Sequence, residues 1–315
     1  MPFINKFGGA APSRSEDTDR YIQTMGLRSS ADINILEYIT MSSTGNMTDF
    51  GDSATAGGQS GNGLSSGARG VYKMGYGAGA TAANNVIEYI TMATTGNGTD
   101  FGNTGGTTYT LGCIASATRG LFYVGHWSTG YDTIEYITID STGNATDFGN
   151  ATDLRRNAGG GGGSETRGIQ ANGIVGSFAV VTIDYVTIAS TGNATDFGDT
   201  STGIIHQSAC SNSTTRYVIT GGLGTGGDNV MQYVTIASTG NTTDFGDLTL
   251  SVSAHGAGGN SVRGISASGG LNKSGWADSD VIDYITIAST GNATDFGNLS
   301  AGSTSTGSIS WQLAA

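Results

Sequence analysis

Several aromatic residues stand in short Gly-rich and polar stretches, where surface loops are expected. These residues are Tyr76 in GYGAG, His126, Trp127 and Tyr131 in HWSTGYD, Phe178 in GSF, and Trp276 in SGWADSD. An aromatic ring exposed on a loop of a rigid scaffold suits stacking against a sugar or anchoring a protein partner. Polar groups beside Trp127 and Trp276 would come from His126, Ser128, Asp278 and Asp280. Ordinary loop packing is the competing interpretation, and the sequence does not exclude it.

The other residues that suit catalysis or metal binding lack the spacing that either function requires. His126, His206 and His255 stand at different positions of a repeated unit, so they predict no symmetric metal site. Calcium needs several oxygen ligands from one loop, whereas each repeated Asp, such as Asp147, is flanked by Thr and Phe. The run Gly159–Gly163 lacks the following Lys of a phosphate loop and is expected in an innermost strand. We therefore predict no enzyme activity, no metal and no cofactor.

The repeated unit is a fifteen-residue phrase that occurs six times, as in EYITIDSTGNATDFG and DYITIASTGNATDFG. Its tyrosines are Tyr38, Tyr89, Tyr136, Tyr185, Tyr233 and Tyr284. Each is followed twelve residues later by a phenylalanine: Phe50, Phe101, Phe148, Phe197, Phe245 and Phe296. Intervals of 47 to 51 residues indicate an array whose units bury their faces against their neighbours. Such symmetric repetition leaves few places for unique chemistry.

Each unit has the pattern of four short β-strands. The segment Ile134–Ile139 (IEYITI) is rich in β-branched and aromatic residues, STGN supplies a turn, and TDFG begins the next strand. A Gly-rich stretch, a turn before Arg119 and the apolar segment LFYVG complete the unit. Four strands in this order and length are typical of a propeller blade, so the expected fold is all-β.

The two ends of the chain predict that the ring of blades closes. A repeated arginine marks each unit: Arg20, Arg69, Arg119, Arg167, Arg216 and Arg263. The array therefore begins in the middle of one unit, at Arg20, and ends in the middle of another, after Phe296. The C-terminal segment GSTSTGSISWQLA would supply the strand that the first unit lacks. We predict one six-bladed β-propeller over residues 20–315, closed by pairing of its N- and C-terminal strands.

Other repeated positions have structural interpretations. Each copy contains Asn-x-Thr, which matches a glycosylation acceptor, but its place in a turn favours capping of backbone groups. The acids before the repeated tyrosines, such as Glu37 and Asp283, and Gln232 in one copy, are expected on the blade surface. Cys113 and Cys210 each precede a repeated Arg by six residues. That spacing predicts one small core position shared by two blades, and no disulfide.

Charge and composition exclude several classes of partner. The chain has 315 residues, 54 of them Gly, and a net charge of −12. Its Lys and Arg residues form no run, so neither nucleic acid nor a membrane surface is an expected partner. No stretch suits membrane insertion, and the first residues lack the apolar core of a secretory signal. We expect the chain to be soluble in the cytoplasm that synthesises it.

The order of the strands resembles that of the kelch β-propeller family. VYKMGYG, EYITMAT and TDFGN follow the kelch order, with Phe where kelch repeats have Trp. The Gly pair of the family is kept at Gly221–Gly222 and Gly269–Gly270. The wording STGNATDFG also resembles kelch-like repeats in virion structural proteins of bacteriophages, notably marine phages. The resemblance covers about residues 20–315 and implies a kelch-like six-bladed propeller.

The resemblance to phage proteins implies a non-enzymatic virion component, such as a tail, fibre or decoration protein, with other virion proteins as partners. Residues 1–19 would form a docking arm, with Phe3, Ile4 and Phe7 as apolar anchors that become ordered on a partner. The alternative function is a lectin-like adhesin that binds host-surface glycans through the loops carrying Trp127 and Trp276.

Overall fold

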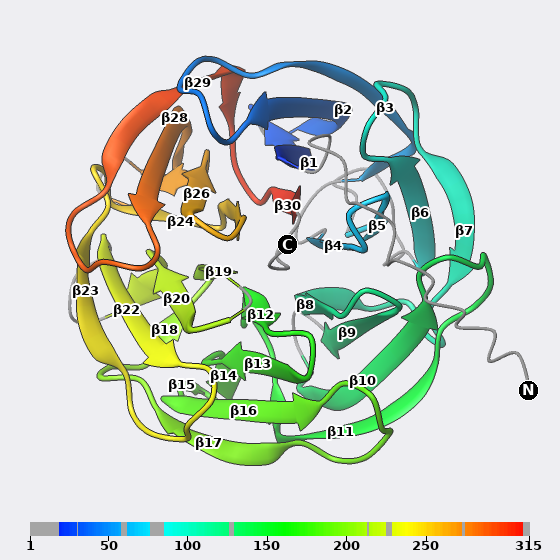
Figure 1. Ribbon diagram of the computed structural model, residues 1–315, viewed down its shortest axis with the longest axis vertical. Helices are drawn as coiled ribbons and strands as arrows, with labels where there is room; N and C mark the ends of the chain where they lie inside the picture. Colours follow the sequence, from blue (N-terminus) through cyan, green and yellow to red (C-terminus); the bar gives the residue numbers. More distant parts are fainter. Residues whose placement is uncertain are drawn as a thin grey trace, which may run out of the picture.

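A computed structural model of the protein describes residues 19–29, 31–57, 62–75, 85–125, 129–212, 214–224, 229–272 and 275–310. The secondary structure of these residues consists of β-strands, with no helix among them. The strands form six blades around one axis (Figure 1). Within the described ranges, no helix is long and apolar enough to cross a membrane. The protein is thus the all-β, six-bladed propeller that the repeat spacing predicts.

Each blade is an antiparallel sheet of four principal strands, which follow one another from the axis outward. Blade 1 contains β30 (Gly307–Ser310), β1 (Arg20–Arg28), β2 (Ala31–Thr40) and β3 (Thr48–Gly57). Blade 2 contains β4 (Asn62–Ser65), β5 (Arg69–Lys73), β6 (Val86–Thr91) and β7 (Thr99–Asn103). Blade 3 contains β8 (Tyr109–Ala115), β9 (Arg119–Gly125), β10 (Tyr131–Thr138) and β11 (Thr146–Arg155).

The second half of the ring follows the same plan. Blade 4 contains β12 (Gly161–Gly163), β13 (Arg167–Ala171), β16 (Thr182–Thr187) and β17 (Thr195–Asp199). Blade 5 contains β19 (Ser208–Ser211), β20 (Arg216–Thr220), β22 (Val230–Thr235) and β23 (Thr243–Asp247). Blade 6 contains β25 (Gly256–Gly259), β26 (Arg263–Ala267), β28 (Ala277–Thr286) and β29 (Thr294–Ser303). The glycine run thus forms an innermost strand, β12, as predicted.

The C-terminal strand closes the ring. β30 pairs antiparallel with β1, with Ile309 opposite Ile22. Just before this pairing, Leu27 and Thr304 exchange backbone hydrogen bonds of 2.8 and 2.9 Å. In Figure 1 the red strand β30 completes the blade of the blue strands β1 and β2. The predicted closure by the two ends of the propeller is confirmed.

The hydrophobic core lies between the blades. Six apolar clusters occur in the described residues, and each joins two neighbouring blades. The cluster of Tyr21, Ile39, Ile265 and Phe296, for example, joins blade 1 to blade 6. Each interface between neighbouring blades, which we call a seam, therefore has its own core, and the closing seam is built like the other five.

Near the axis, each seam pairs a side chain with a glycine. In four seams, a side chain of an innermost strand packs against a glycine of the next blade. A Cβ added to that glycine would lie only 2.5–2.9 Å from the side chain. These pairs are Ile309 with Gly70, Leu64 with Gly120, Ile114 with Gly168, and Cys210 with Gly264. The other two seams reverse the arrangement, because Tyr217 lies against Gly162 and Tyr21 lies against Gly258. The glycines thus leave room for the neighbouring blade.

Strand direction sorts the connections onto two faces. The face that carries the links between the second and third strands, and between successive blades, is called the loop face. It bears two small sheets, formed by β14 (Ile174–Val175) with β15 (Phe178–Ala179) and by β18 (Ile204–Ile205) with β21 (Leu223–Gly224). It also bears β24 (Val252–Ser253) and β27 (Gly270–Leu271), which extend the sheet of blade 6 through β28. The STGN turns and the turns before the repeated arginines lie on the opposite face, called the turn face.

Candidate functional site: the loop face and the axial hollow

The repeated Arg, Tyr and Phe residues connect neighbouring blades. In every blade the guanidinium lies 4.4–4.7 Å from the centre of the Tyr ring. That ring meets the repeated Phe edge to face, with centroids 5.8–6.1 Å apart. Each arginine also donates to a backbone carbonyl of the next blade at 2.7–3.1 Å, and the bond from Arg263 to Met41 joins blade 6 to blade 1. These residues have a structural role.

The residues before the repeated tyrosines are buried, so the prediction of a blade-surface position is wrong. Their exposed fractions are all 8 % or less, for Glu37, Glu88, Glu135, Asp184, Gln232 and Asp283. Each of these side chains accepts a backbone N–H of the preceding blade, from the second half of its outer strand or from the residues just after that strand. Asp283, for example, accepts from the Thr249 N–H at 2.9 Å. Burial raises the pKa of Glu135 and Asp283, and these hydrogen bonds oppose that shift.

The STGN turns bind the preceding blade through their backbone and their Asn side chains. In every copy the turn Gly donates its N–H to the carbonyl of the repeated Phe at 2.7–2.9 Å. The following Asn Oδ1 accepts a backbone N–H of the same strand at 3.0–3.1 Å. The Gly of TDFG has φ of 139–152°, and a Cβ there would lie 2.3–2.5 Å from the turn carbonyl. The Asn-x-Thr segment is thus a structural turn, as its position predicts.

Cys113 and Cys210 do not occupy equivalent positions, which corrects the sequence alignment. Cys113 lies opposite Phe122, three residues after Arg119, whereas Cys210 lies opposite Val218, only two residues after Arg216. The turn of blade 5 is one residue longer, since Asn212 bonds to the Arg216 carbonyl where Ser116 bonds to that of Arg119. The two thiols therefore belong to different seams. Both are buried and free, and burial raises both pKa values.

Two of the predicted binding residues can be placed on the loop face. Tyr131 begins β10 and is 36 % exposed, and Trp276 precedes β28 and is 43 % exposed. Tyr76, His126 and Trp127 lie outside the described residues, as do Phe3, Ile4 and Phe7 of the predicted arm. The structure places Tyr131 in blade 3 and Trp276 in blade 6, so these two side chains do not form one site.

Trp276 belongs to a contact between blades 5 and 6. Its ring meets the ring of His206 edge to face, with centroids 6.1 Å apart and planes at 89°. The ring also covers Gly270, where a Cβ would lie 2.8 Å from Trp276 Cε3. Trp276 has a φ of 66°, a left-handed backbone conformation that is unusual for a bulky residue. This conformation and these contacts hold a partly exposed indole beside His206.

Tyr131, Leu154 and Phe178 are exposed apolar residues on neighbouring segments of blades 3 and 4, and we call the three together the blade 3–4 patch. Leu154 is 57 % exposed and Phe178 is 78 % exposed. Backbone pairing links the three residues: Tyr131 lies opposite Arg155, Arg156 bridges to Ile174, and Val175 lies opposite Phe178. Large apolar side chains exposed on neighbouring segments are candidates for contacts with a protein partner.

Segments from five blades surround a polar hollow at the axis. Its empty space is about 370 Å³ with open solvent included, and about 40 Å³ of it admits water-sized groups. Four residues that precede innermost strands have a left-handed backbone conformation, with φ of 52–56°: Asn157, His206, Ala254 and Ser305. Backbone bonds of 3.0 Å from His206 to Asn157 and of 2.8 Å from Ala254 to His206 join three of these segments. We call this space the axial hollow.

The side chains lining the axial hollow are polar and uncharged at neutral pH. They include Asn62, His206, Gln207, His255 and Thr306. Burial lowers the pKa of His206 and of His255 to about 4, so both imidazoles are neutral near pH 7. In the part of the chain that the structure describes, no three His, Cys, Asp or Glu side chains gather as metal ligands would.

Two side chains of the axial hollow have polar atoms without a protein partner. Gln207, which is 3 % exposed, donates to the carbonyls of Gly159 and Ala171, but its Oε1 accepts no hydrogen bond. His255, which is 4 % exposed, contacts Thr220 Oγ1 through Nε2 at 2.9 Å, and its Nδ1 has no partner. Each of these atoms has less than 1 Å² of exposed surface, so neither is open to the hollow.

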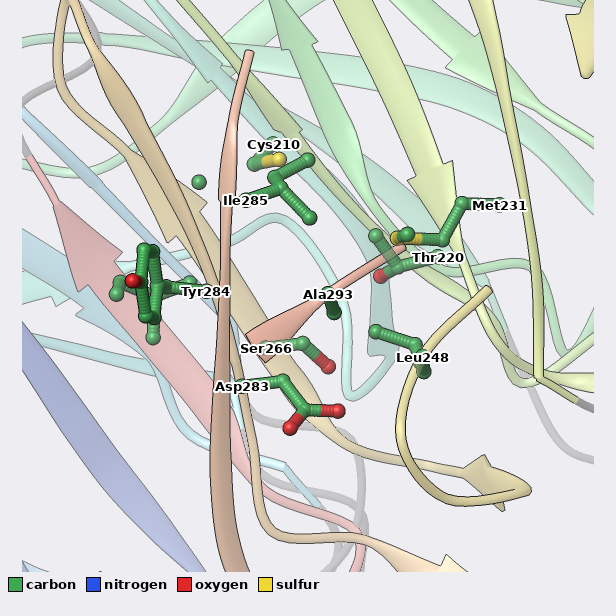
Figure 2. Close-up of a pocket in the computed structure, with 11 residues that line it drawn as sticks. Cys210, Thr220, Met231, Leu248, Ser266, Asp283, Tyr284, Ile285 and Ala293 are labelled. Atoms are coloured by element: carbon green, nitrogen blue, oxygen red, sulfur yellow. The ribbon is translucent and has the colours of Figure 1, made fainter. Parts of the chain in front are cut away.

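A second cavity, between blades 5 and 6, is unsuited to ligands. Figure 2 shows Met231, Leu248 and Ile285 around it, with Thr220 and Asp283 on its borders. Its empty volume is about 170 Å³, but none of that space admits a water molecule. This cavity is a packing gap within the seam.

Sequence patterns did not indicate the axial hollow, because its lining comes from separate blades at unlike residues. His206 and His255 do differ in repeat position, as predicted, yet both line this one space. No protein-family model matches the sequence, and no curated protein matches it.

Proposed function

We propose that this protein is a non-enzymatic structural component of a bacteriophage virion, a rigid kelch-like disc whose loop face holds other virion proteins. The observation that carries the proposal is the contrast between the repeated residues and the exposed loop residues. The repeated polar side chains are engaged between blades, whereas the exposed aromatic residues Tyr131, Phe178 and Trp276 lie on the loop face. The phage assignment is supported by the resemblance of STGNATDFG to repeats of virion proteins, and it implies a virion location after synthesis in the host cytoplasm.

The blade 3–4 patch is the proposed docking surface for a virion protein. Leu154 is 57 % exposed and Phe178 is 78 % exposed, and an apolar partner surface would bury both. Residues 1–19, with Phe3, Ile4 and Phe7, would add a second apolar contact.

Mass spectrometry of gradient-purified particles tests this proposal. The chain should be present in a constant ratio to the major capsid protein, and its presence in the lysate but absence from particles would overturn a virion role. Phe178→Ser should reduce incorporation by roughly tenfold, because an interface anchor is lost. Val262→Ser is the matched control, since Val262 is 57 % exposed on the turn face. Equal incorporation of both variants would exclude docking through this patch.

A lectin-like adhesin for host-surface glycans is the second candidate function. The observation that favours it is the partly exposed indole of Trp276, held edge to face against His206 on the loop face. Aromatic rings beside polar groups are suited to stacking against sugar rings.

A further inference from the structure

We propose that Lys73 makes the seam between blades 2 and 3 sensitive to pH, so that this seam opens more easily near neutral pH than in mildly alkaline solution. The device is one amine buried between two blades. The closed seam disfavours the charge of this amine, and the open seam accepts it. The inference goes beyond the proposed function and does not depend on it.

The position of Lys73 makes this seam different from the other five. Lys73 is the last residue of β5, four residues after the repeated Arg69, and its exposed fraction is 0 %. Long cationic side chains are almost never fully buried without a structural or functional reason. The equivalent residues of the other blades are uncharged at neutral pH: Thr24, Tyr123, Ala171, Thr220 and Ala267.

The amine of Lys73 crosses the seam. Its Nζ donates a hydrogen bond to the carbonyl of Thr108 in blade 3 and another, of 3.2 Å, to the carbonyl of Met74 in blade 2. Backbone carbonyls accept these bonds but carry no full negative charge. A neutral amine keeps two N–H groups and can maintain both bonds, so the closed seam does not require the charged form.

The surroundings of Lys73 in this seam are mainly apolar. Ile87 lies opposite Lys73 on β6 and belongs to the apolar cluster between blades 2 and 3. Phe122 and Val124 of β9 belong to the same cluster. Removing a positive charge from water into such surroundings is costly, so the neutral amine is favoured.

Two titratable groups of blade 3 act on Lys73, namely Cys113 of β8 and Glu135 of β10. Burial lowers the pKa of Lys73 from 10.5 to about 7, and this effect outweighs the opposing influence of both groups. Burial also raises the pKa of Cys113 and of Glu135, and Asp147 adds to the shift of Glu135. The carboxylate of Glu88, on β6, faces the other seam, where it accepts backbone N–H groups of blade 1.

The direction of the pH effect follows from proton binding in the two forms. Water reaches the amine in the open seam, so its pKa there returns toward 10.5. Between pH 10.5 and 7 the open form therefore binds a proton that the closed form lacks. The closed seam gains stability as the pH rises through this window, and the effect levels off below pH 7. The equilibrium constant for opening should fall by about 20-fold from pH ~6.5 to ~8.5.

Hydrogen exchange of the Gly143 amide, measured by NMR on the intact protein, tests the proposal. Gly143 donates its N–H across this seam to the Phe101 carbonyl at 2.7 Å, and Gly96 makes the equivalent bond of 2.8 Å across the seam between blades 1 and 2. After correction for intrinsic exchange rates, protection of Gly143 should rise by about 20-fold between pH ~6.5 and ~8.5, and that of Gly96 by less than about threefold. Equal rises at the two amides would overturn a response confined to this seam.

Two substitutions identify the titrating group. Lys73→Met keeps a long apolar side chain, and Lys73→Thr introduces the residue that blades 1 and 5 have as Thr24 and Thr220. In either variant, protection of Gly143 should change by less than about threefold over the same pH range. A folded variant of either kind that keeps the wild-type pH dependence at Gly143 would assign the effect to another group and contradict the proposal.

Discussion

The perimeter of the propeller and its axis use their residues in opposite ways. At the perimeter, the same Arg, Tyr, Phe, Asn and Gly positions recur in all six blades and make the same contacts to a neighbouring blade. At the axis, the segments that lead into the innermost strands of four blades have unlike residues at the same position: Ala158, Gln207, His255 and Thr306. The difference shows that the residues repeated in this chain are those that contact a neighbouring blade. Variation marks positions where a unique binding site is structurally permitted.

Opening the ring is expected to have the largest effect. Deleting the last fifteen residues removes β30 and the bonds between Leu27 and Thr304, which leaves the first blade without its innermost strand. Because every seam depends on the next, we expect loss of cooperative folding, measured by urea denaturation followed by circular dichroism. A truncated chain with the unfolding midpoint of the full protein would contradict closure by β30.

Breaking one perimeter contact should be severe but local. Asp184 has no exposed surface, pairs with Arg155 at 2.9 Å and accepts the Thr152 N–H at 3.2 Å. Asp184→Ala leaves the buried guanidinium of Arg155 with Asp153, at 3.6 Å, as its remaining carboxylate, so the free energy of unfolding should fall by about 3 kcal/mol. The exposed Asp196 gives the control Asp196→Ala, which should change stability by less than about 0.5 kcal/mol. Similar losses in both variants would refute the perimeter account.

Exchanging the side chain and the glycine across one seam should be partly tolerated. Gly162→Leu places atoms against Tyr217, because a Cβ there lies 2.9 Å from Tyr217 Cδ2, and should cost about 1–3 kcal/mol. Adding Tyr217→Gly reproduces the arrangement of Ile114 with Gly168 in the neighbouring seam. The loss of stability in the double variant should be smaller than the sum of the two single losses, by about 0.5–3 kcal/mol. Additive losses in denaturant titrations would show that the two residues do not pair.

The axis should contribute the smallest effect, through pH. Burial lowers the pKa of His255 from 6.5 to about 4, so the unfolded chain binds its proton first as the pH falls. The stabilisation is present above pH 6.5 and is lost toward pH 4, which gives about 1 kcal/mol between pH 7 and 5.5. Unfolding curves of His255→Gln should lack this share of the pH dependence while His206 keeps its own. Parallel pH profiles for the two proteins would contradict a neutral, buried His255.

The sequence was sufficient to predict the propeller, its six blades, its closure and the place of the glycine run, because period and split ends depend on local patterns. It failed at Glu37 and Asp283, since their partners are backbone N–H groups of another blade and leave no mark in composition. It also failed at Cys210, where one extra residue in the turn moves the thiol to the other side of the strand. The axial hollow joins unlike residues from five blades, so no repeat alignment indicates it.

The most direct test of the closed ring is hydrogen exchange, by NMR, of the six turn amides that cross the seams. These are the N–H groups of Gly45, Gly96, Gly143, Gly192, Gly240 and Gly291. Gly45 crosses the seam between blades 6 and 1, where it donates to the Phe296 carbonyl at 2.9 Å, and the other five cross internal seams. A closed ring predicts protection of Gly45 within about tenfold of the other five. Rapid exchange at Gly45 alone, with the other five protected, would show an open ring and contradict the account.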